Sequence, residues 1–160
     1  MTAEEYAEQV KVELGDAWLP HIYRERIRRM RTRSYSFEGL PKTHRVEIQH
    51  TLLGVELKVG SKRMLCPDLA TARYLSVFAR AGCGDVAVPY DITRISQLAD
   101  QLESAWHRMV LLAEHHAAAK SDAFRSRLRK LLVGKIRIEI TESGAGASVP
   151  EFKQSTKQRK

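Results

Sequence analysis

The strongest constraint on the fold is a helical repeat of apolar residues over residues 92–117. Apolar side chains recur every three or four positions along one side, and polar side chains occupy the other. This pattern predicts an amphipathic helix that buries one face. At 1.5 Å per residue the helix would be about 39 Å long, so the rest of the chain must pack around it. Its apolar positions are Ile92, Ile95, Leu98, Ala99, Leu102, Ala105, Trp106, Met109, Val110 and Ala113.

The N-terminal third predicts a pair of helices. Thr2 and Glu5 have the spacing of a capping box, and Gly15 is placed to end the helix that they begin. A second helix is expected over about residues 19–33, with Pro20 in its first turn. Its arginines occupy the side away from the apolar stripe, so this helix would show six of them to solvent.

The middle of the chain changes to the two-residue period of strands. Alternating residues predict strands over 45–50, 55–59 and 63–66, followed by a helix over 68–81 and a short strand over 86–90. Pro89 cannot donate a ladder hydrogen bond, so the last of these strands should lie at a sheet edge. The segment between the arginines and the first strand, residues 34–43, is expected to form a loop.

The C-terminal part predicts a helix–strand unit and a tail. A helix over 122–133 would end at Gly134, and Ile136, Ile138 and Ile140 would point inward from a strand over 135–142. Residues 143–160 have few apolar side chains and are expected to form a disordered basic tail. We therefore expect one α+β domain over residues 1–142: an N-terminal helical pair, a small antiparallel sheet of three or more strands, a long central helix and the C-terminal unit.

The positive charge of the chain is concentrated in two segments. The 160 residues carry a net charge of +8, but residues 1–20 alone have a net charge of −4. Residues 21–45 and residues 120–137 each have a net charge of +6, whereas residues 46–119 are close to neutral. Two concentrated basic segments on a near-neutral body are typical of a protein that binds a polyanion.

These segments predict a non-enzymatic protein that binds RNA, DNA or a ribonucleoprotein. Guanidinium groups match phosphate oxygens bidentately and release condensed counterions when they bind a nucleic acid. Tyr35 and Phe37 follow the first segment and could stack on an unpaired base, and the basic end of the tail, up to Lys160, could act as a mobile arm. The expected contacts are Arg24, Arg26, Arg28, Arg29, Arg31, Arg33, Arg125, Arg127, Arg129 and Lys130.

Two other interpretations of the charge stay open. The arginines could bind an acidic protein, in which case the chain would be a scaffold or assembly factor. They could also pair internally with the acidic residues 1–20, which adjoin the first basic segment but cannot neutralise both segments. A homodimer is a further possibility, because Trp106 and Met109 on the long helix are residue types that interfaces favour.

One short segment resembles a nuclease family. Glu56 and Lys58 alternate onto one face of a predicted strand, and the helix 68–81 and the strand 86–90 follow. This order resembles the core of the PD-(D/E)xK nucleases, which implies a metal-dependent nuclease with Glu56 and Lys58 in its site. The family's earlier aspartate has no clear counterpart, since the nearest upstream acid is Glu47. The plain alternative is that alternation simply turns Glu56 and Lys58 toward water.

No other catalytic, metal or cofactor motif is present in the sequence. The histidines and the two cysteines, Cys66 and Cys83, have none of the spacings of zinc sites, and no glycine-rich phosphate loop follows a predicted strand. Two cysteines cannot make a disulfide framework, and no apolar run approaches the roughly 20 residues of a membrane span. With an acidic N-terminus unlike a signal peptide, these features predict a cytoplasmic protein without a cofactor or a membrane partner.

Overall fold

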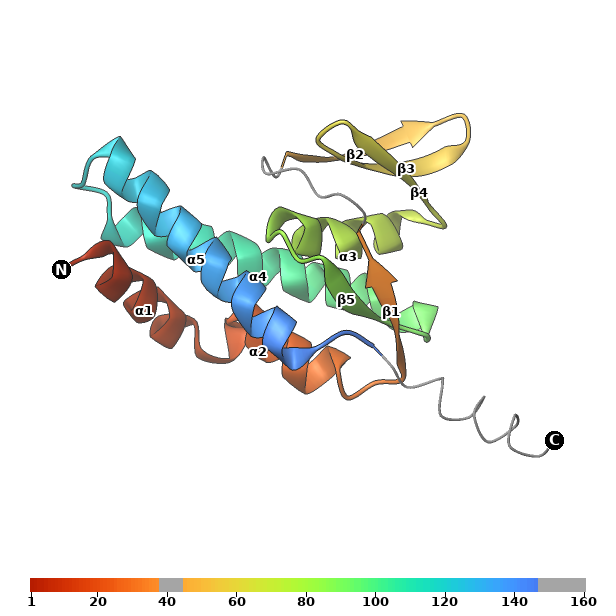
Figure 1. Ribbon diagram of the computed structural model, residues 1–160, viewed down its shortest axis with the longest axis horizontal. Helices are drawn as coiled ribbons and strands as arrows, with labels where there is room; N and C mark the ends of the chain where they lie inside the picture. Colours follow the sequence, from red (N-terminus) through yellow and green to blue (C-terminus); the bar gives the residue numbers. More distant parts are fainter. Residues whose placement is uncertain (38–44, 147–160) are drawn as a thin grey trace.

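The computed structural model describes residues 1–37 and 45–146 and combines helices with two small antiparallel sheets (Figure 1). The α+β class is therefore confirmed. The part of the expected tail that covers residues 147–160 lies outside the described residues. Within the described residues, no helix has both the length and the apolar character to span a membrane.

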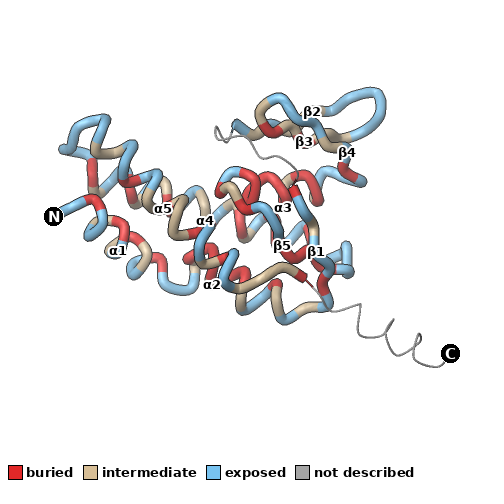
Figure 2. Tube along the Cα trace, viewed as in Figure 1, coloured by how far each residue is buried: buried red, intermediate tan, exposed pale blue. Residues whose placement is uncertain are grey.

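The long central helix is confirmed as α4 (Ile95–His116), preceded by a single 3₁₀ turn over Ile92–Arg94 that Asp91 caps. Its apolar side is covered by α1 (Ala3–Leu14), α3 (Leu69–Arg80) and α5 (Asp122–Ser143), and buried positions line the facing sides of these helices (Figure 2). Met109 is buried within this core and Trp106 packs against it, so both side chains contribute to the hydrophobic core of the single chain.

The predicted C-terminal helix–strand unit is wrong, because α5 is one continuous helix over Asp122–Ser143. Gly134 lies inside it and does not end it. The buried residues are spaced by four, at Leu128, Leu132, Ile136 and Ile140, and this row packs against α1 and α4. Ile138, which a strand would have turned inward, is 56% exposed.

The helix predicted over residues 19–33 is also too long. It consists of α2 (Leu19–Ile22), which has Pro20 in its first turn as expected, and a π-helical turn over Tyr23–Ile27. The chain then enters a strand, β1 (Thr32–Ser36), where a loop was expected. Arg33 consequently lies on a strand and not on a helix.

Two separate sheets hold the strands. The three-stranded meander of β2 (Val46–Thr51), β3 (Gly54–Val59) and β4 (Lys62–Cys66) lies on α3, as Figure 1 shows. β5 (Asp85–Pro89) pairs antiparallel with β1 in a sheet of two strands, with Pro89 opposite Thr32. The prediction of an edge position for β5 is confirmed, since each strand of a pair is an edge.

The chain does not leave the fold at residue 143, where the expected tail began. The Tyr23 hydroxyl donates to the Gly144 carbonyl (2.7 Å), and the Ser34 hydroxyl donates to the Gly146 carbonyl. A Cβ on Gly146 would come within 2.5 Å of the Arg33 carbonyl oxygen, so only glycine fits this close approach. Residues 144–146 are thus fixed beside β1.

Replacing Tyr23 by Phe is expected to lower the free energy of unfolding by about 1–2 kcal/mol. The hydroxyl also accepts from the buried Ala87 N–H (2.9 Å), which would lose its partner. Urea denaturation measures the change, with Tyr90→Phe as the control because Tyr90 is 44% exposed. Equal stability of the two variants would show that the Tyr23 hydroxyl does not fix this junction.

Candidate nucleic-acid interface

The first basic segment occupies the π-helical turn, the residues after it and β1. Two of the six arginines between residues 24 and 33 lie within 4.0 Å of a carboxylate. Arg24 turns toward α5 and lies 3.5 Å from the Glu139 carboxylate, and Arg29 lies 3.5 Å from Glu25 one helical turn earlier. The Arg29 side chain is 75% exposed, so this pair contributes little to stability.

The other four of these six arginines are Arg26, Arg28, Arg31 and Arg33. No carboxylate oxygen in the described part of the chain lies within 4.0 Å of the guanidinium groups of Arg26, Arg28, Arg31 or Arg33. Arg26, Arg31 and Arg33 are exposed, whereas Arg28 is partly buried beside Gly144. We call Arg26, Arg28, Arg29, Arg31 and Arg33 the arginine cluster.

Four of the seven cations of the second basic segment have carboxylate partners within the fold. Arg125 pairs with Asp122, Arg129 lies 3.3 Å from Glu114 of α4, and two further cations reach α1. These two are Arg127, 2.8 Å from Glu4, and Lys135, 3.4 Å from Glu8. Lys130 is exposed, and no carboxylate of residues 1–37 or 45–146 lies within 4.0 Å of it.

The acidic first helix therefore pairs with the second basic segment and not with its neighbour in sequence. α1 and α5 run side by side in the same direction, which brings residues 4, 8 and 11 opposite residues 127, 135 and 139. Internal pairing, one of the alternatives that the sequence left open, applies to four cations of α5. Within the described residues, the arginine cluster has only the exposed pair of Arg29 with Glu25.

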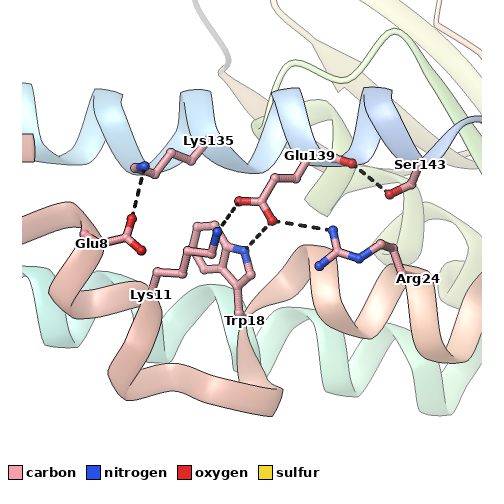
Figure 3. A network of polar contacts seen from close by, with 7 residues as sticks. All are labelled: Glu8, Lys11, Trp18, Arg24, Lys135, Glu139 and Ser143. Atoms are coloured by element: carbon pink, nitrogen blue, oxygen red, sulfur yellow. Dashed lines mark hydrogen bonds and ion pairs between the residues drawn. The ribbon is translucent and has the colours of Figure 1, made fainter.

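Glu139 is the centre of the contact between these helices (Figure 3). Its carboxylate accepts from the Lys11 ammonium (3.0 Å) and from the Trp18 indole N–H (3.1 Å), and Arg24 approaches it at 3.5 Å. Burial alone would raise the pKa of Glu139, but the hydrogen bonds from Trp18 and Lys11 outweigh burial and hold the pKa below its ordinary value. Glu139 is therefore an ionised structural residue, and Arg24 beside it keeps a side chain that is 41% exposed.

The structure does not bring the two basic segments together. Arg24 lies beside Glu139, whereas the second group of predicted contacts, Arg125 to Lys130, occupies the first turns of α5. Twelve residues separate Arg127 from Glu139, which is about 18 Å along the helix. The start of α5, which carries Arg125 to Lys130, lies at the opposite end of the helical layer from α2 and β1 in Figure 1, so these predicted contacts do not adjoin those of the first segment.

The aromatic residue beside the arginine cluster is Tyr90, which the sequence did not single out. Phe37 is buried, and the Tyr35 ring packs edge-on against it at 5.2 Å while its hydroxyl donates to Met64 Sδ (3.0 Å). Tyr90 directly follows β5, and its N–H donates to the Arg31 carbonyl (3.0 Å). Only the pairing of β1 with β5, which the sequence does not specify, places this ring next to Arg31.

Glu56 and Lys58 lie on one face of β3, as alternation requires. Glu56 is opposite Gln49 and Leu65, and Lys58 is opposite Glu47 and Arg63. Glu56 Oε1 is buried and has no hydrogen-bond partner among the described residues. β5 pairs with β1 and not with this sheet, so the elements of the nuclease resemblance are divided between two sheets.

Metal-binding and thiol groups are sparse in the described residues. Residues 1–37 and 45–146 contain no group of three or more His, Cys, Asp or Glu side chains positioned to hold a metal ion. Cys66 and Cys83 are both buried, and burial raises the pKa of both thiols, to about 12 for Cys83. Protonated thiols are poor nucleophiles at neutral pH.

Comparison with known proteins yields no relative: no protein-family model matches the chain, and searches of curated proteins and of solved structures find no match.

Proposed function

We propose that this protein binds RNA or DNA, without catalysing a reaction on it, through the arginine cluster at the junction of the π-helical turn and β1. The observation that carries the proposal is the absence of carboxylates within 4.0 Å of Arg26, Arg28, Arg31 and Arg33 in the described part of the chain, although α5 is well supplied with them.

Like charges on neighbouring residues repel one another, and an external anion relieves that repulsion. Arginine suits a phosphate ligand better than lysine does, because its planar group donates two parallel hydrogen bonds to phosphate oxygens. Alternation along β1 sets Arg31 and Arg33 on one side of the strand, so both can reach the same backbone. The second basic segment is not part of this proposed surface. Its exposed Lys130 contributes only to the overall positive charge that attracts the nucleic acid.

Replacing Arg26, Arg31 and Arg33 together by Ala is expected to weaken nucleic-acid binding at least tenfold at about 100 mM salt. The slope of log K against log salt should become less steep by about 0.7 for each phosphate of a single strand that is no longer neutralised, or by about 0.9 on duplex DNA. Fluorescence anisotropy with labelled 20-nucleotide RNA and DNA, single-stranded and duplex, measures both quantities.

The matched control is the triple replacement of Arg125, Arg127 and Arg129 by Ala, which removes the same number of charges from the paired segment. It should change the affinity by less than about threefold, because those arginines already have carboxylate partners. Equal losses in the two triple variants would show that only net charge matters, and the arginine cluster would then not be the site. Failure of the unaltered chain to bind any of the four probes would overturn the proposed function.

A further inference from the structure

An open pocket of about 530 Å³ lies beside the arginine cluster. Met30, Arg31, Tyr90, Asp91 and Arg94 line it. The strand pairing forms it: the backbone bond from Tyr90 to Arg31 continues the β1–β5 ladder by one residue pair, and the chain then turns into the 3₁₀ segment that carries Arg94. A pocket of this size is within the range that holds a small ligand or one unit of a polymer.

The Tyr90 ring gives this pocket an aromatic surface. The ring is 44% exposed, and the guanidinium carbon of Arg31 lies 5.9 Å from its centroid. The other described tyrosines are less accessible: Tyr23 and Tyr74 are buried, and Tyr6 and Tyr35 are partly buried against neighbouring side chains. Exposed aromatic rings and the planes of arginine guanidinium groups are both surfaces on which nucleobases stack.

The polar groups of the pocket carry both signs of charge. Asp91 Oδ2 lies 3.6 Å from Arg94 Nε, and Asp91 Oδ1 accepts from the backbone N–H and the hydroxyl of Thr93. These bonds from Thr93 hold the pKa of Asp91 below its ordinary value, so the carboxylate is ionised at neutral pH. A carboxylate disfavours a phosphate inside the pocket, but a carboxylate beside a guanidinium matches the mixed donors and acceptors of a base edge.

From this arrangement we infer that the pocket holds one unpaired base stacked on Tyr90, so that the ligand of the arginine cluster is single-stranded RNA or DNA. The inference rests on the proposed function and narrows it. The phosphates next to the stacked base would contact Arg31 and Arg33, which face the same side of β1. A duplex cannot bind in this way, because its bases are stacked on one another and their faces are covered.

The test is Tyr90→Ala against Tyr90→Phe, measured with single-stranded 20-nucleotide RNA and DNA and with the corresponding duplexes. Loss of one stacked base is expected to weaken single-strand binding by Tyr90→Ala about 5- to 150-fold. Tyr90→Phe should retain the affinity, since the ring remains. The salt slope should be unchanged in Tyr90→Ala because no charge is removed, and duplex binding should not change. Circular dichroism checks that the variant is folded.

A second probe separates bases from phosphates. An abasic oligonucleotide of the same length keeps the phosphates, so it should bind the unaltered chain more weakly than the intact strand does. It should bind Tyr90→Ala as tightly as the intact strand does, because neither complex then has the stacked base.

The possible failures are distinguishable. If Tyr90→Ala binds single strands as tightly as the unaltered chain while the Arg26/Arg31/Arg33 variant does not, this inference is overturned and the proposed function stands. A clear preference of the unaltered chain for duplexes would also overturn the inference alone. Absence of binding to every probe would overturn both.

Discussion

Ile136→Ala is expected to lower the free energy of unfolding by about 2–5 kcal/mol, whereas Ile138→Ala should change it by less than about 0.5 kcal/mol. The two residues are two positions apart and chemically identical, but Ile136 is fully buried and Ile138 is 56% exposed. Truncating Ile136 removes buried methyl groups and leaves a cavity between α5 and its neighbours. Truncating Ile138 removes groups that already face solvent. Chemical denaturation followed by circular dichroism measures both variants.

This pair of variants separates a helix from a strand. In a strand over 135–142, both isoleucines would point to the same side, so the two replacements would cost about the same. In the helix α5, residues two apart point in directions about 200° different, and only Ile136 belongs to the buried row. Similar losses for Ile136→Ala and Ile138→Ala would contradict the continuous helix.

The sequence supported a strand here because three β-branched residues alternate with polar ones just after a glycine. The competing signal is the row of Leu128, Leu132, Ile136 and Ile140, which has the four-residue spacing of a helix face. This four-residue spacing is recognised only when residues on both sides of Gly134 are assigned to one helix. Glycine in a helix interior costs about 1 kcal/mol, and packing of this row against α1 and α4 outweighs that cost.

Elements with long and consistent patterns were predicted well. The capping box of Thr2 and Glu5, α3, α4 and the β2–β3–β4 meander are all present close to their predicted bounds. β1 was missed because it follows an arginine run that fits a helical stripe equally well. Its partner, β5, lies about 50 residues later in the chain, and no local pattern specifies that pairing.

The candidate site could be predicted only in part for the same reason. Net charge locates both basic segments, but the pairing of charges depends on which helices pack together. The contacts of Glu4 with Arg127 and of Glu8 with Lys135 join residues that are more than 120 positions apart in the sequence. They neutralise part of the second segment and leave the arginine cluster as the candidate surface.

Glu139→Ala is expected to lower the free energy of unfolding by about 2–3 kcal/mol, because it removes the acceptor shared by Lys11 and the Trp18 indole. The Trp18 side chain is buried, so its N–H would lose a partner where water cannot readily replace it. Glu142→Ala is the matched control on the same helix, since Glu142 is exposed, and it should cost less than about 0.5 kcal/mol. A control loss as large as that of Glu139→Ala would mean that helix composition, and not this network, causes the change.

The contribution of the Glu139 charge should depend on pH in one direction. The pKa of Glu139 is lower in the folded chain than its ordinary value of 4.5, so the unfolded chain binds the proton more readily. The stability that ionised Glu139 provides is therefore complete above pH 4.5 and is lost as the pH falls through the lower folded-state pKa. Glu139→Gln keeps one oxygen as an acceptor for the Trp18 indole, but it removes the charge and replaces the oxygen that accepts from Lys11 with an NH2 group. Its difference in unfolding free energy from the unaltered chain should thus be largest near pH 7 and shrink on acidification, as measured by urea denaturation at a series of pH values. A difference that stays constant across that series would show that the network acts through hydrogen-bond geometry alone and that the charge of Glu139 does not stabilise the α1–α5 contact.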